Sequence, residues 1–214
     1  MKKLLPKQKY YENIANTIIK NFKKRQIEGY YCPNKISALQ KALELIPKGS
    51  RIGWGGSMTL IETGLISALQ DGNYKILDRD IASSLEEEKE IYSQIFHSDY
   101  FLMSTNAITL DGELINIDRK GNRVALLCFG PQNVLILTGL NKVVTDIESG
   151  FKRIQNVASS SNSIRLNRNT PCAITGKCEN CYSPDCMCGQ FVITRRSGIT
   201  NRIKVILIGE ELGY

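Results

Sequence analysis

Five of the seven cysteines of this 214-residue chain lie in one short stretch. The stretch runs from Cys172 to Cys188, contains the Cys-x-x-Cys pair Cys178 and Cys181, and is interrupted by Gly and Pro. Thiolates are soft ligands, and four of them in a tetrahedral arrangement select zinc or an iron–sulfur cluster. We therefore expect a metal or iron–sulfur site in this stretch. Unrelated free thiols on a surface loop are the alternative.

The spacing of these cysteines favours one of the two cofactors. Zinc ribbons usually bring two Cys-x-x-Cys pairs from separate hairpins, whereas here one pair and all the candidate ligands share one segment. We expect a [4Fe–4S] cluster, with zinc as the alternative. Cys128 lies in an apolar run and is expected to be a buried apolar residue.

A glycine-rich turn, Gly53-Trp-Gly-Gly-Ser-Met-Thr59, is the second region with residues suited to chemistry. Glycines allow a ligand to approach the backbone, and amides at the start of a following helix favour an anion. The turn matches neither a P-loop nor the Gly-x-Gly-x-x-Gly pattern. A tight turn with Ser57 as helix cap is the alternative. The candidate ligands for a carboxylate or phosphate are Gly55, Gly56, Ser57 and Thr59.

Polar residues after later apolar segments extend this candidate site. We expect four of them to bind substrate: Asn106, Asn122, Arg123 and Lys142. The lone histidine, His97, ends a predicted helix and is expected to cap it rather than to catalyse. Asp111 and Glu62 are therefore the candidate acid/base residues. A turn residue and a solvated side chain are the respective alternatives.

The first half of the chain alternates helices with short apolar strands. We expect helices over residues 7–28, from Asn34 to Ile46, over 58–69, and from a capping box at Ser84 with Leu85 facing inward. We expect strands over residues 51–54, 74–77 and 100–103. This alternation predicts an α/β fold with a mostly parallel sheet covered by helices.

The second half begins with a hairpin signal. Segments 107–110 and 114–117 flank Asp111-Gly112 and predict paired strands. Further strands are expected over 124–129, 134–138, 191–194 and 203–208. A second capping box at Thr145 predicts a helix through residue 157, and residues 159–163 are expected to be a linker.

Composition limits the class of protein. The apolar fraction of 42% and charged fraction of 23% are typical of a globular domain, and no apolar run reaches the length of a membrane span. Two lysines near the start precede no apolar region, so we expect no signal peptide, no disulfide framework and a cytoplasmic location. The net charge of +7 attracts anions, but no nucleic-acid motif accompanies it. We expect a small anionic metabolite rather than nucleic acid.

Several segments together resemble the LUD domain family, of the LutC/YkgG lactate-utilisation type. They cover nearly the whole chain in order. The matching segments are 53–59, 104–112, 121–125, 130–131, 139–142, the cysteine spacing from Cys172 to Cys188, and 209–214.

The resemblance implies an open Rossmann-like sheet similar to the NagB/RpiA/CoA-transferase-like fold. We expect an N-terminal helical segment over residues 1–48, and a LUD domain over 49–214 with a cysteine-rich insertion at 170–190. The resemblance also implies a ligand quartet that leaves Cys186 aside: Cys172, Cys178, Cys181 and Cys188.

The resemblance further implies a role in lactate-type organic-acid metabolism. The expected partners are iron–sulfur redox proteins, a small anionic metabolite and further copies of the chain. Two alternatives remain open. One is a non-catalytic assembly or sensor subunit with a structural metal site, and the other is a CoA- or sugar-phosphate-processing enzyme without redox chemistry.

Overall fold

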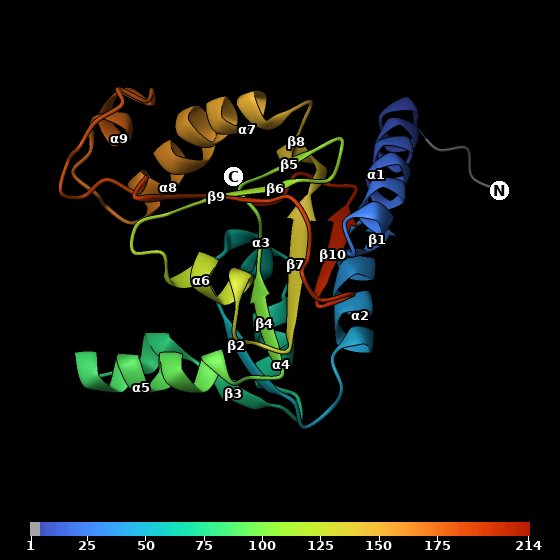
Figure 1. Cartoon of the computed structure of the whole chain (residues 1–214), viewed down its shortest axis with the longest axis horizontal. Helices are drawn as coiled ribbons and strands as arrows, with labels where there is room; N and C mark the ends of the chain where they lie inside the picture. Colours follow the sequence, from blue (N-terminus) through green and yellow to red (C-terminus); the bar gives the residue numbers. More distant parts are fainter. Residues whose placement is uncertain (1–4) are drawn as a thin grey trace.

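The computed structural model describes residues 5–214. The first four residues, on which the expectation about a signal peptide partly rests, lie outside the described residues. The central feature is a six-stranded sheet with the order β1-β10-β7-β4-β2-β3, and every pairing in it is parallel (Figure 1). Its strands are β1 (Glu28–Cys32), β2 (Arg51–Trp54), β3 (Lys75–Leu77), β4 (Tyr100–Met103), β7 (Asn133–Gly139) and β10 (Ile203–Ile208).

A smaller sheet lies beyond the carboxyl ends of these strands, with the order β8-β5-β6-β9. Its strands are β5 (Ala107–Thr109), β6 (Leu114–Asp118), β8 (Val143–Val144) and β9 (Gln190–Thr194). β5 and β6 are antiparallel, which confirms the predicted hairpin. β9 pairs with β6 and therefore carries the end of the cysteine-rich stretch back to the hairpin.

Helices cover both faces of the six-stranded sheet. On one face the core includes Ile18 of α1, Ile95 of α5 and Leu127 of α6. On the other face it includes Ala42 of α2 and residues of α3 and α4. The bounds are α1 (Pro6–Lys24), α2 (Lys35–Leu45), α3 (Met58–Glu62), α4 (Leu65–Gln70), α5 (Leu85–Phe96) and α6 (Asn122–Cys128).

The helices after β8 pack on the smaller sheet. Ile154 packs with Ala107 and Ile115 of the hairpin in a separate core cluster. These elements are α7 (Ile147–Arg153), a π-helical turn η3 (Ile154–Ala158), α8 (Ser159–Arg165) and α9 (Pro171–Thr175). Two 3-10 turns, η1 (Arg79–Ile81) and η2 (Leu140–Lys142), follow β3 and β7.

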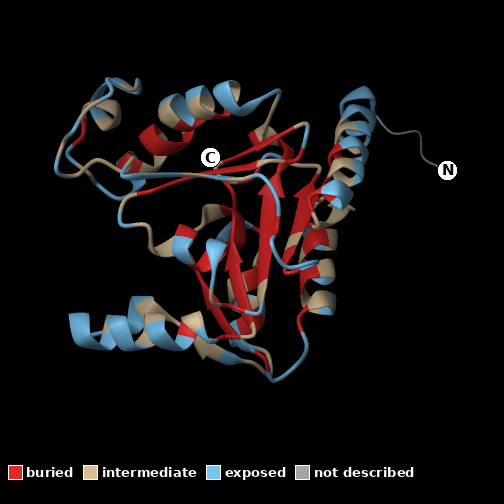
Figure 2. Ribbon diagram, in the orientation of Figure 1, coloured by how far each residue is buried: buried red, intermediate tan, exposed pale blue. Residues whose placement is uncertain are grey.

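Burial of both faces explains why the strands could be recognised in the sequence. Val134–Leu137 of β7 are completely buried, and the central strands form the buried interior in Figure 2. A strand that is covered on both sides reads as a continuous apolar run rather than as an alternation. The predicted α/β fold with a mostly parallel, helix-covered sheet is confirmed. Within residues 5–214 no helix combines the length and apolar content that a membrane crossing demands.

One apolar run was predicted as a strand and forms a helix. Residues 124–129 belong largely to α6 because Gly121, in a left-handed conformation with φ of 83°, turns the chain into the helix. The Asp118 carboxylate then accepts a hydrogen bond from the Val124 amide at 3.0 Å and caps the first turn. A short apolar run does not distinguish a buried helix from a buried strand. Cys128, on the last turn, is exposed, contrary to prediction.

Other boundaries also differ from the predictions. The helix predicted over 7–28 ends at Lys24, and β1 follows it as an edge strand paired with β10, so the segment 1–48 is not purely helical. Gly64, with φ of 72°, divides the helix predicted over 58–69 into α3 and α4. Residues 159–163 are helical in α8 rather than a linker. Leu85 is exposed rather than inward because it is the first residue of α5.

Candidate functional site

A cavity of about 560 Å³ lies at the carboxyl end of the parallel sheet. β3, which follows β2 in the chain, pairs with one side of β2, whereas the later strands β4 and β7 lie on the other side. The loops after β2 and β4 therefore run in opposite directions along the sheet. Ligands of open α/β sheets bind where the strand order reverses in this way. The glycine turn after β2, residues 104–106 after β4 and Lys142 after β7 meet at this point.

Positive charge dominates the cavity wall. Three acidic residues line it: Asp80, Glu88 and Asp118. Seven basic residues line it: Arg79, Arg119, Lys120, Arg123, Lys142, Arg165 and Arg168. A concave surface with this excess attracts an anion and raises its local concentration.

Two of the arginines converge on Gly56. A Cβ atom at this glycine would lie 3.4 Å from Nη2 of Arg79 and 4.0 Å from Nη2 of Arg165. The guanidinium groups come from η1 and α8, so segments distant in sequence meet above the glycine turn. Because Gly56 has no side chain, a ligand can approach its backbone between the two cations. The helix that follows, α3, has only five residues, so the cationic side chains rather than a helix terminus provide the main attraction for an anion.

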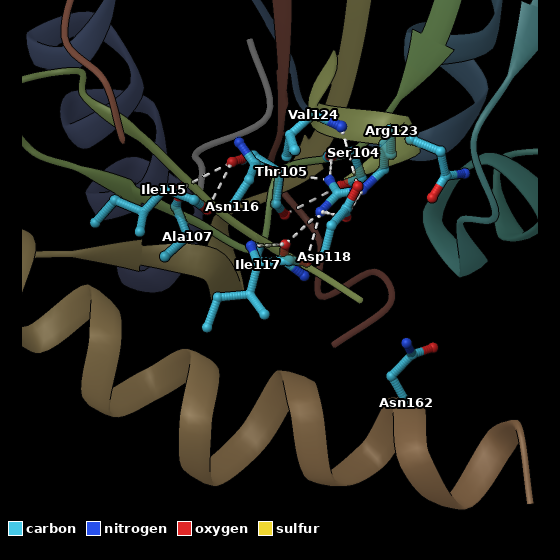
Figure 3. Close-up of polar contacts among 12 residues, drawn as sticks. Ser104, Thr105, Ala107, Ile115, Asn116, Ile117, Asp118, Arg123, Val124 and Asn162 are labelled. Carbon is cyan, nitrogen blue, oxygen red and sulfur yellow. Dashed lines mark hydrogen bonds and ion pairs between the residues drawn. The ribbon is translucent and has the colours of Figure 1, made fainter. Parts of the chain in front are cut away.

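Arg123 is the centre of a partly buried hydrogen-bond network (Figure 3). All five N–H donors of its guanidinium have protein partners. They are the Asp118 and Asn116 side chains, the Ser104 carbonyl, the Asn106 side chain and the Ile117 carbonyl, at 2.7–3.0 Å. Since an arginine has five donors, none remains for a substrate. The geometry therefore corrects the expected role of Arg123 from direct substrate ligand to support of the cavity wall.

Lys142 is a buried cation on the cavity wall. It is 3% exposed, and Nζ donates to Thr59 Oγ1 at 2.9 Å and to Ser104 Oγ at 3.0 Å. Burial, together with the smaller effects of the neighbouring charges of Arg153 and Arg123, lowers the pKa of Lys142 to about 7, whereas Glu62 acts in the opposite direction. Among residues 5–214, no carboxylate lies within 4 Å of this amine. Lys142 is thus poised to exchange a proton near neutral pH.

Several other predicted ligands lie at or behind the cavity. Gly56, Ser57, Asn106 and Asn122 line it. Gly55 lies against Arg123, whose Cδ would be 3.0 Å from a Cβ atom there. Thr59 is buried and holds Lys142. Asn122 donates to the Tyr92 hydroxyl, which also accepts from Arg79, so it supports the arginine above Gly56.

The two predicted acid/base residues are not among the residues that line the cavity. Asp111 lies at the tip of the β5–β6 turn, 69% exposed, with Lys24 at 3.7 Å. Glu62 is exposed, and one of its oxygens accepts a hydrogen bond from the Gly213 amide at 2.8 Å. The structure therefore keeps Asp111 apart from the other predicted site residues, whereas Glu62 lies behind the wall, near enough for its charge to act on Lys142. Glu62 instead fixes the C-terminal segment that carries Tyr214 to the cavity.

Sequence reasoning missed several residues of this site. Arg79 and Arg165 stand in segments where charged residues are ordinary surface residues, so no local pattern distinguishes them. Asp118 carries a better signal, because it precedes Gly121 and the apolar run that becomes α6. Ser104 lay in a segment that matched the family resemblance, but its contact with Lys142 is a tertiary feature.

A second cavity, of about 690 Å³, adjoins the first. Arg119, Lys120 and Met187 line both cavities. The five cysteines of the 172–188 stretch line the second one: Cys172, Cys178, Cys181, Cys186 and Cys188. Two of them contact hydroxyls of α8, since Cys172 Sγ lies 3.8 Å from Ser163 Oγ and Cys188 Sγ lies 3.4 Å from Ser159 Oγ. The cysteine stretch and the glycine turn, separated by more than a hundred residues, are therefore neighbours in space.

The donor set of this second cavity fits the group that the sequence predicts. Five soft sulfur atoms face one cavity, which is the ligand chemistry of zinc and of iron–sulfur clusters. Burial raises the pKa of the Cys188 thiol to about 11, so a cation would have to displace its proton. Within residues 5–214, no three Cys, His, Asp or Glu side chains are already close enough to hold a metal ion together. Both the ligand quartet and the cluster stay predictions.

Comparisons with known proteins agree with this architecture. A model of the LUD domain family matches residues 15–208. A DUF162 family protein from Deinococcus radiodurans has the same fold, with a TM-score of 0.55 and 11% identity over 92% of this chain and 98% of that one. No curated protein matches the sequence.

Two further solved structures match at a TM-score of 0.34. Ribose 5-phosphate isomerase from Plasmodium falciparum is 20% identical over 52% of each chain. eIF2B delta from Chaetomium thermophilum is 17% identical over 67% of this chain and 55% of that one.

Proposed function

The chain belongs to the LUD domain family, and on that premise we propose that it binds a small carboxylate- or phosphate-bearing metabolite in the 560 Å³ cavity. One observation carries the proposal: Arg79 and Arg165 converge above Gly56 in a cavity whose basic residues outnumber its acidic ones. Two guanidinium groups on one anion give charge-assisted hydrogen bonds, which are stronger than those between neutral groups. A small polar acid would occupy such a cavity better than an apolar ligand.

We propose further that the chain works in the redox metabolism of organic acids. Cys172, Cys178, Cys181 and Cys188 would hold a [4Fe–4S] cluster, which when bound would supply one-electron transfer. Oxidation of a 2-hydroxy acid to a 2-oxo acid releases two electrons and two protons, so partner redox proteins would have to accept the electrons. The wall shared by the two cavities supports this proposal, because it would place the acid beside the cluster.

Ligand binding can be tested by calorimetry and thermal shift on the full chain with lactate, pyruvate, glycolate and a sugar phosphate. We expect saturable binding of at least one acid, weakened by Arg79→Gln and unaffected by Arg195→Gln. Arg195 is a suitable control because it is exposed and belongs to neither cavity wall. Binding of none of these anions would refute the proposal, and binding of the sugar phosphate alone would favour the enzyme without redox chemistry.

The cluster can be tested separately by anaerobic reconstitution with iron and sulfide. We expect a brown protein with about four iron atoms per chain, as a [4Fe–4S] cluster requires. Alanine at any quartet cysteine should remove most of the iron, and Cys186→Ala should retain it. A colourless protein with stoichiometric zinc would overturn the cluster, and loss of iron in Cys186→Ala would overturn the choice of ligands.

A further inference from the structure

The donor and acceptor roles of the two hydroxyl groups that contact Lys142 follow from their other hydrogen bonds. The Thr59 hydroxyl donates to the Leu212 carbonyl at 3.3 Å, and the Ser104 hydroxyl donates to the Thr105 carbonyl at 3.4 Å. Because a hydroxyl has one hydrogen, each of these oxygens can only accept from Lys142. Both contacts of the lysine are therefore N–H groups donated by Nζ.

This arrangement fixes what the amine can offer to the cavity. A neutral amine has two N–H groups and one lone pair. Thr59 and Ser104 take both N–H groups, so the lone pair is the part of Nζ that is free to interact with a ligand. The charged form would instead bring a third N–H with no protein acceptor within hydrogen-bond distance among the described residues, in a wall already rich in arginine.

The charged groups around Lys142 come from three elements. Arg153 of α7 and Arg123 of α6 disfavour the ammonium form, and Glu62 of α3 favours it. The Glu62 carboxylate is engaged with the Gly213 amide, and the Arg123 charge is balanced by Asp118 at 2.8 Å. Arg153 donates to the carbonyls of Asn106 and Asn141 and forms no ion pair among residues 5–214. Its uncompensated charge adds to the effect of burial and favours the neutral form of the lysine.

The partners of Lys142 differ from those of Lys204, another lysine that is largely shielded from solvent. Lys204 is also shielded, with 13% of its side chain exposed. Its Nζ lies 3.8 Å from the Glu28 carboxylate and donates to Asn133 Oδ1 at 2.8 Å, so its charged form is compensated. Lys142 has hydroxyls where Lys204 has a carboxylate. The two residues differ in the charge of their partners rather than in burial alone.

We propose that Lys142 is the catalytic base of the site and takes the hydroxyl proton of a bound 2-hydroxy carboxylate. The ligand O–H bond breaks, and its electron pair stays on the oxygen as an alkoxide. A new N–H bond forms on the lone pair of Nζ, and the proton stays on the resulting ammonium ion. This inference rests on the proposed function, since it requires the acid to bind beside Arg79 and Arg165. It replaces Asp111 and Glu62, which do not line the cavity. The ligand class follows from the wall: a carboxylate for the arginines and an adjacent hydroxyl for the amine.

The protonation of Lys142 can be measured without turnover, by NMR of the full chain with ¹³C-labelled lysine side chains. We expect one lysine signal with a titration midpoint near neutral pH. Lys142→Met should remove this signal, whereas Lys204→Met should remove a different one. Saturating lactate should raise the midpoint, because a bound carboxylate favours the ammonium form. A Lys142 signal that titrates in the ordinary lysine range would overturn the proposal.

Two additions keep the test decisive. Thr59→Val preserves the shape of the side chain and removes one hydroxyl partner, so it should shift the same signal and assign it even if Lys142→Met does not fold. Lactate binding, measured on the same samples, separates the two proposals. If lactate binds and Lys142 titrates normally, only the base is wrong. If no 2-hydroxy acid shifts the Lys142 midpoint or binds to the chain, both the base and the acid site fail.

Discussion

The 560 Å³ cavity, which we call the anion cavity after its proposed ligand, shares a wall with the 690 Å³ cavity lined by the five cysteines, which we call the cysteine cavity, but the two are built differently. The first stands on the carboxyl ends of parallel strands, and its central side chains are hydrogen-bonded: Lys142 is buried and Arg123 is mostly buried. The second is formed by an irregular loop with one short helix, where Ile174 is 80% and Tyr182 is 98% exposed. The parallel sheet therefore positions the side chains of the first cavity before any ligand binds. We expect the order of the second to depend on the group that its cysteines bind.

Arg123→Met should cause the largest loss of unfolding free energy, and it tests how far the anion cavity is stabilised by its hydrogen-bond network. The substitution leaves the buried Asp118 carboxylate without its partner, which typically costs about 3–5 kcal/mol of unfolding free energy. Arg119→Met is the matched control from the shared wall. Its side chain is 32% exposed and pairs with Asp185 at 3.4 Å, so we expect a loss below about 1 kcal/mol. Urea denaturation of both variants measures the difference, and equal losses would refute the comparison.

Lys142→Met should change stability in a way that depends on pH. The folded chain binds this proton with a pKa of about 7, and an unfolded lysine binds it near 10.5, so the unfolded state holds more protons between these values. The wild-type chain should therefore gain stability relative to the variant as pH rises from 7 to 10. The expected change in the difference is on the order of 2–4 kcal/mol. Denaturation curves of both proteins at several pH values provide the measurement, and a difference independent of pH would argue against a neutral Lys142.

The fold was predictable where the local pattern and the tertiary packing agree. The strands β2, β4, β7 and β10 are apolar because helices cover both faces, and the sequence shows this directly. Residues 124–129 are equally apolar, but their helical form depends on the positive φ of Gly121 and on a cap from Asp118. β1 was missed because Glu28–Cys32 is an edge strand with only one buried residue.

The candidate site was predictable in part for the same reason. The glycine turn, Asn106 and Lys142 follow strands whose carboxyl ends meet in any parallel sheet, so their proximity follows from the fold. The contributions of Arg79 and Arg165 depend on how η1 and α8 pack, which no local pattern encodes. Asp111 was a misleading candidate because a hairpin tip and a catalytic loop have similar composition. Its position beside α1 became visible only in the structure.

Arg165→Gln should weaken binding of the anion without unfolding the chain. The side chain is exposed, and its nearest partner is Asn162 on the same helix, so little stability depends on it. Loss of one charge-assisted hydrogen bond costs about 1.5 kcal/mol, or about tenfold in affinity. Calorimetry at low and high salt should show a larger effect at low salt, because ions screen exposed charges. The same affinity in Arg165→Gln and in Arg195→Gln would exclude Arg165 from the binding site.

Asp185→Asn should have the smallest effect on anion affinity and tests whether the two cavities are coupled. Asp185 lies between Cys181 and Cys186, and its carboxylate faces Arg119 at 3.4 Å and Arg168 at 3.6 Å. These pairs are partly exposed, so we expect a loss below about 1 kcal/mol in unfolding free energy. Both arginines also line the anion cavity, so release of the loop should change anion affinity by about two- to threefold, equivalent to about 0.5 kcal/mol.

The same variant should make the 172–188 cysteine loop easier to cleave by a protease. If the proposed cluster is reconstituted, the variant should also lose iron faster to a chelator. Asp80→Asn is the matched control, because Asp80 is an exposed acid of the anion cavity whose ion pair is with Arg79 rather than with a residue of the shared wall. It should leave loop cleavage unchanged. If Asp185→Asn alters cleavage but not anion affinity, the loop moves independently and the shared wall carries no coupling. If both change together, the salt bridges of Asp185 connect the site that the sheet fixes to the site that the loop forms.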